Sequence, residues 1–142
     1  MSKMIWLVGL GVLAGAAVMF LLLRDRLGGS DLPEPLARWQ AHLAAAGIEA
    51  RGNLVRAGAR GSQLRFNGHF RVKGATQPMF LQWYDSHDSA LAQLAVVQRY
   101  PEGAAALVRG ELLLDLPGWP LADAMTQQVR TAFQSFDVPQ AR

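Results

Sequence analysis

Three histidines are the side chains of this 142-residue chain best suited to acid–base or metal chemistry. They are His42, His69 and His87, and no two have the H-x-x-x-H or H-E-x-x-H spacing that presents two imidazoles to a zinc ion. His87 lies in the segment DSHDS, whose carboxylates could join it on a metal, but Asp and Ser are also the residues that begin helices. The chain has no cysteine, which excludes thiolate metal sites, disulfides and cysteine nucleophiles. We therefore predict no metal site.

No other motif assembles a catalytic group. The sequence contains no G-x-S-x-G elbow for a serine nucleophile and no G-x-x-x-x-G-K-[ST] loop for a nucleotide phosphate. Asp85, Asp88 and Asp115 could converge near strand ends, where acidic residues are also usual in turns and helix caps. We predict that the protein is not an enzyme and uses no cofactor.

A glycine motif near the start of the chain has two interpretations. Gly9, Gly11 and Ala14 fit G-x-G-x-x-G/A, the turn that places a dinucleotide's pyrophosphate at a helix N-terminus. The segment that follows has no polar face, so it cannot form the amphipathic helix that this turn requires. Residues 4–23 hold no charge and would make a helix of about 30 Å, the thickness of a bilayer's hydrocarbon core. We predict an uncleaved transmembrane helix, in which Gly11 and Gly15 form a G-x-x-x-G contact with another helix.

Positive charge is concentrated in one interval of the chain. No acidic residue lies between Glu49 and Asp85, whereas this interval holds five arginines and one lysine. Residues 64–73 alternate between apolar and polar, which predicts a half-buried strand with a basic outer face. We call it the basic strand face, and it comprises Arg65, His69, Arg71 and Lys73, beside Asn67. Such a face could attract anionic lipid headgroups or an acidic protein, or be simply solvated; nucleic acid is not expected, because the aromatic residues fall on the inner face.

Four parts of the chain are predicted. They are a membrane anchor (1–26), a linker (27–35), an α+β domain (36–137) and a tail (138–142). Within the domain, the changes of hydrophobic period predict the order α-β-β-β-α-β-α. Short turns pair neighbouring strands antiparallel, while the helical crossover would allow the third and fourth strands to lie parallel. The predicted fold class is α+β: a single N-terminal transmembrane helix, then a four-stranded, mainly antiparallel sheet with three helices, packed mainly on one face.

These features predict a binding role at a membrane. We expect a non-enzymatic, single-pass accessory or scaffold protein that binds another component of a bacterial envelope complex, or a second copy, through its span and its α+β domain. The alternative is a membrane-proximal module that binds lipid or a small ligand in an apolar cleft, lined by Trp83, Trp119, Phe133 and Phe136. The predicted location is the bacterial inner membrane. The arginines after the span favour the cytoplasmic side, but the composition of the domain favours the periplasmic side, where we expect the domain to lie.

Overall fold

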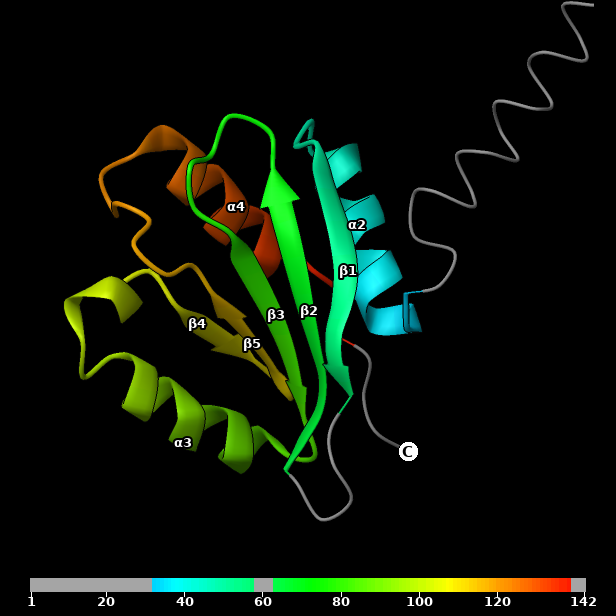
Figure 1. The fold of residues 1–142 in the computed structure, drawn as a ribbon, viewed down its shortest axis with the longest axis vertical. Coiled ribbons are helices and arrows are strands. Elements are labelled where there is room, and N and C mark those ends of the chain that lie inside the picture. Colours follow the sequence, from blue (N-terminus) through cyan, green and yellow to red (C-terminus); the bar gives the residue numbers. More distant parts are fainter. Residues whose placement is uncertain (1–31, 58–62, 139–142) are drawn as a thin grey trace, which may run out of the picture. The chain divides into compact units, whose positions relative to one another are not determined.

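Five strands form one antiparallel sheet in this computed structural model, which describes residues 32–57 and 63–138 (Figure 1). Their bounds are β1 Ala50–Ala57, β2 Leu64–Val72, β3 Met79–Tyr84, β4 Leu107–Arg109 and β5 Leu112–Asp115. The sheet order is β1–β2–β3–β5–β4, and every neighbouring pair is antiparallel. The described residues belong to one compact unit that begins at Leu32.

Three α-helices within the described ranges cover the sheet, two on one face and one on the other. Their bounds are α2 Glu34–Ala45, α3 His87–Val97 and α4 Ala124–Gln134, and a short 3-10 turn, η1 Pro101–Gly103, follows α3. Helices α2 and α4 pack on the face that holds the larger core, whereas α3 packs against β3, β4 and β5 on the opposite face. Figure 1 shows that α3 lies over the β4–β5 side of the sheet and leaves β1 and β2 uncovered.

The larger core lies between the sheet and helices α2 and α4. Trp39 of α2 meets the rings of Phe133 and Phe136 edge-on, with ring centres 5.6 and 5.3 Å apart. Alternate residues of the strands complete this core because successive side chains of a strand point to opposite faces. Those that are fully buried are Phe70, Met79, Leu81, Leu112 and Leu114. A smaller core under α3 contains Tyr84, Ala90 and Leu113.

The structure contradicts the predicted fold in the number of strands. The expected fourth strand is a hairpin, in which Gly110 and Glu111 join β4 to β5. Gly110 has a φ of +54°, a left-handed conformation that glycine adopts at no steric cost. Because the chain turns back here, β5 rather than β4 lies beside β3, and it does so antiparallel. The expectation that the helices lie mainly on one face holds for α2 and α4 but not for α3.

No helix among the described residues is long and apolar enough to cross a membrane. The three described helices have 11 or 12 residues, or roughly 16–18 Å, against the ~30 Å of a hydrocarbon core. This finding contradicts the prediction of a single-pass inner-membrane protein. The segment that carries that prediction, residues 4–23 with Gly11 and Gly15, lies outside the described residues. The predicted linker (27–35) extends into α2, which already begins at Glu34.

Helix ends follow local sequence signals in part. The hydroxyl oxygen of Ser86 accepts a hydrogen bond from the backbone N–H of Ser89 at 3.1 Å and so caps α3, within the segment DSHDS whose Asp and Ser residues favour a helix start. Gly47, with a φ of +79°, follows the end of α2, where glycine commonly ends a helix. The N-cap of α2 is Pro33, which makes no side-chain hydrogen bond.

Candidate functional site

The three histidines lie on different elements and do not form one site. The Nε2 atom of His42 on α2 is 2.8 Å from the carbonyl oxygen of Ala132, so this ring ties α2 to α4. The Nδ1 atom of His87 is 2.6 Å from the carbonyl oxygen of Gly110, which links α3 to the β4–β5 turn. His69 is on β2. In residues 32–57 and 63–138, no group of three or more His, Asp or Glu side chains could hold a metal ion.

The part of the sheet that α3 leaves uncovered is the candidate binding surface. We call it the open sheet face, and it consists of the outward side chains of β1, β2 and β3. These residues are Arg51, Asn53, Asn67, His69, Arg71, Phe80 and Gln82. In the strand register, Asn53 lies opposite His69, and His69 opposite Phe80, whose ring it meets at 5.2 Å between centres. The face therefore combines polar and aromatic groups in continuous cross-strand rows.

Two arginines lie directly opposite each other on this face. Arg51 of β1 pairs in register with Arg71 of β2, an arrangement that places Cβ atoms about 5 Å apart. Both side chains are exposed, and neither has an ion-pair partner among the described residues. Like charges directly opposite in a sheet repel each other. An anion bound by both guanidinium groups would remove this repulsion and accept charge-assisted hydrogen bonds.

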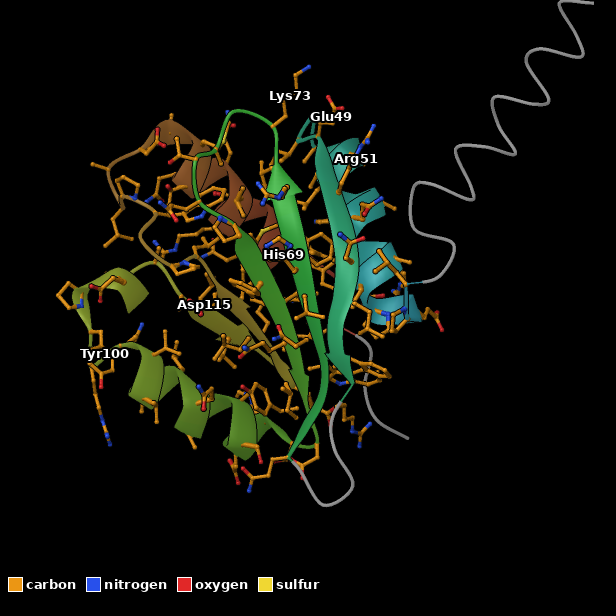
Figure 2. All side chains as sticks on the ribbon, in the orientation of Figure 1. Glu49, Arg51, His69, Lys73, Tyr100 and Asp115 are labelled. Atoms are coloured by element: carbon orange, nitrogen blue, oxygen red, sulfur yellow. The ribbon has the colours of Figure 1, made fainter. Side chains whose placement is uncertain are left out.

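A surface ion pair closes one end of the open sheet face. Lys73 Nζ lies 3.5 Å from a carboxylate oxygen of Glu49, and the two side chains are 80% and 65% exposed. Figure 2 shows this pair beside Arg51 at one end of β1 and β2, with His69 further along the sheet. The charge of Lys73 is therefore already compensated, whereas those of Arg51 and Arg71 are not.

The structure divides the predicted basic strand face. A bulge between Leu64 and Phe66 interrupts the alternation of β2, so Arg65 does not follow His69 and Arg71 onto the open sheet face. Instead, its guanidinium carbon lies 5.1 Å from the centre of the Trp83 ring, which packs against the larger core.

One member of the site was missed by the sequence pattern. Arg51 belongs to a different strand from the predicted basic strand face, and only the β1–β2 register brings it opposite Arg71. The signal that could have found it is the absence of acidic residues between Glu49 and Asp85, which marks both strands as basic.

A partly buried carboxyl marks the border between the open sheet face and α3. Asp115 of β5 lies opposite Phe80, and its Oδ1 atom is buried without a hydrogen-bond partner. Burial raises the pKa of Asp115 above its ordinary value. The neighbouring Tyr84 donates a hydrogen bond to Gln82 at 2.7 Å. Burial, and then the charge of Asp115, raise the pKa of Tyr84 to about 12.

We expect Asp115→Asn to raise the free energy of unfolding at pH 7 more than at pH 3. The pKa of Asp115 in the folded state exceeds the ordinary value of 3.8, so stability falls as the pH rises above 3.8 and the folded carboxyl ionises. At pH 3 the carboxyl is mostly protonated in both the folded and the unfolded state, so replacing it with an amide changes the free energy of unfolding little. Urea unfolding of both proteins at the two pH values measures the difference. An equal gain at both pH values would contradict burial of the charge as its cause.

The fold and its site define a small α+β domain with a five-stranded antiparallel sheet, one face of which is half covered. No family model, curated protein or solved structure matches this chain.

Proposed function

We propose that this chain is a non-enzymatic binding module whose open sheet face binds an acidic segment of another protein. The observation that carries the proposal is the pair Arg51 and Arg71, opposed in register, exposed and without a carboxylate partner in the described residues. A carboxylate that bridges the two guanidinium groups offsets their repulsion. It also accepts hydrogen bonds in the planar geometry that arginine favours.

The next rows of the open sheet face suit a peptide better than a lone anion. Beyond the arginines, the side chains of Asn53 and His69 can each donate and accept hydrogen bonds, as a peptide backbone requires. The half-buried ring of Phe80 offers an apolar contact beside them. In an extended peptide, the side chains on one face recur about every 7 Å. When one acidic side chain binds the two arginines, the next side chain on the same face of the peptide therefore lies over the row of Asn53 and His69.

The buried aromatic residues favour this face over an apolar cleft. Of the four aromatic residues expected to line a cleft, Phe133 is fully buried and Phe136 nearly so. The indole N–H of Trp119 donates to the carbonyl oxygen of Pro78 at 3.0 Å, and Trp83 donates to Glu111 at 2.9 Å. These rings pack on the larger core, so they support the stability of the domain and not a ligand cavity.

A charge-matched pair of variants tests the proposal. We expect the full chain to bind a fluorescein-labelled decaglutamate peptide, and Arg51→Gln/Arg71→Gln to weaken binding about tenfold, or about 1.4 kcal/mol. The control, Arg38→Gln/Arg99→Gln, removes the same charge from two cations that lie on α2 and after α3, away from the open sheet face. Its affinity should change less than threefold. Fluorescence anisotropy at 50 and 200 mM salt measures both, and binding should weaken at the higher salt because exposed charges are screened.

Two results would contradict the proposal. If both double variants lose the same affinity, the peptide responds to net charge and not to the arginine pair. If the chain binds vesicles that contain phosphatidylserine but not the peptide, the face recognises lipid headgroups instead of a protein.

A further inference from the structure

The exposed side of α3 is apolar between two charged residues. We call it the α3 outer face, and it consists of Asp88, Leu91, Ala92, Ala95 and Val96 of α3 together with Arg99 of the turn that follows the helix. Leu91 and Val96 are 43% and 42% exposed, and both alanines are exposed. No polar side chain interrupts this line of residues between Asp88 and Arg99. A helix side that lacks polar groups usually packs against another apolar surface.

Helix α4 shows what a solvated helix side looks like in the same domain. Its exposed residues are mostly polar and include Gln127, Gln128, Thr131 and Gln134. Both helices have 11 residues and pack on the same sheet. The difference therefore belongs to α3 itself and marks its outer side as an unpartnered surface.

The centre of the α3 outer face has the spacing of a helix-pairing seam. Asp88, Ala92 and Ala95 follow one another at intervals of four and three residues, which keeps them in one line along the helix, and Arg99 follows four residues later in the turn after α3. Leu91 and Val96 lie on either side of this line. Alanines at the centre of a seam let two helix axes approach to about 8 Å.

We propose that the α3 outer face pairs antiparallel with the same face of a second copy of this chain. In that arrangement, Asp88 of each copy meets Arg99 of the other, and Ala92 meets Ala95. A parallel arrangement would instead bring Asp88 against Asp88 and Arg99 against Arg99. Neither residue has an ion-pair partner among the described residues, so both are available for the contact. A patch that complements itself in this way is what a two-fold interface requires.

The size of the surface sets the strength of the dimer. Stable interfaces bury on the order of 1,200–2,000 Å² in total, and two helices of this length bury less. The dimer is therefore weak and depends on concentration. It is also independent of the open sheet face, which lies on β1 to β3.

Engineered cysteines test the pairing in the full chain, which has none of its own. Ala92→Cys protein carrying a tag is mixed with untagged Ala95→Cys protein and oxidised. We expect the tagged–untagged disulfide dimer to form at least fivefold faster than the dimers of either variant with itself. The control is Gln128→Cys on α4, which should form dimers at the background rate. Faster 92–92 and 95–95 dimers, or rates equal to the control, overturn the proposal.

A charge exchange tests the register separately from folding. In the same cysteine proteins, Asp88→Arg alone should slow the cross-link several-fold because it faces Arg99 of the second copy. The double variant Asp88→Arg/Arg99→Asp restores the opposite charges and should return the rate to within twofold of the original. Circular dichroism confirms that each variant is folded. A folded double variant that stays as slow as the single one overturns the antiparallel register.

Discussion

Replacing Phe133 with alanine is expected to lower the free energy of unfolding by about 3–5 kcal/mol. Phe133 is fully buried and meets Trp39 edge-on, so it joins α4 to α2 across the larger core. The substitution removes its apolar burial and leaves a cavity that the rigid surroundings cannot close fully. Urea unfolding, followed by tryptophan fluorescence, measures the loss.

A control substitution to leucine keeps most of the side-chain volume at position 133. Phe133→Leu should cost only roughly 1–2 kcal/mol, because a smaller cavity remains. If Phe133→Ala lowers the free energy of unfolding by less than about 1.5 kcal/mol, Phe133 does not hold α2 and α4 together as the core contacts indicate.

The substitution Gly103→Ala is expected to lower the free energy of unfolding by about 3 kcal/mol, at the upper end of the range for overpacked cores. Gly103 ends η1 and is buried against the last turn of α3. A Cβ atom at this position would overlap the backbone carbonyl of Val97. Backbone cannot move aside as a flexible side chain does, so α3 or the segment leading to β4 must shift. The same unfolding experiment measures this loss.

Gly47→Ala is the matched control. Gly47 follows α2 and has a φ of +79°, and a Cβ atom added there would meet nothing within 4 Å beyond its own chain neighbours. Its cost should be about 1 kcal/mol, from the left-handed conformation alone. Equal losses for the two variants would show that contact with Val97 is not the cause at Gly103.

The elements that could be predicted are those with an uninterrupted hydrophobic period. The strand Met79–Tyr84 is a short apolar run, and α4 follows from an amphipathic pattern that includes Val129 and Phe133. The cap of α3 by Ser86 is a local signal of the same kind, because this interaction involves only neighbouring residues. Local signals of this kind need no knowledge of the rest of the fold.

The features that could not be predicted depend on contacts between distant strands. Between Leu107 and Asp115 the hydrophobic pattern continues through Gly110 without a break. The sequence therefore predicts a single strand where the structure has a hairpin. The bulge that moves Arg65 onto Trp83 has no glycine or proline to mark it. The pairing of Arg51 with Arg71 follows from the register of two strands, which the pattern of one strand does not contain.

The open sheet face is proposed to bind an acidic peptide through Arg51 and Arg71. The most direct measurement is a titration of the ¹⁵N-labelled full chain with decaglutamate, followed by amide chemical shifts in NMR. The largest shift changes are predicted at residues 51–53 of β1 and 69–71 of β2, and they should disappear in Arg51→Gln/Arg71→Gln. Largest changes on α3 or α4, or changes that persist in the double variant, would contradict the claim.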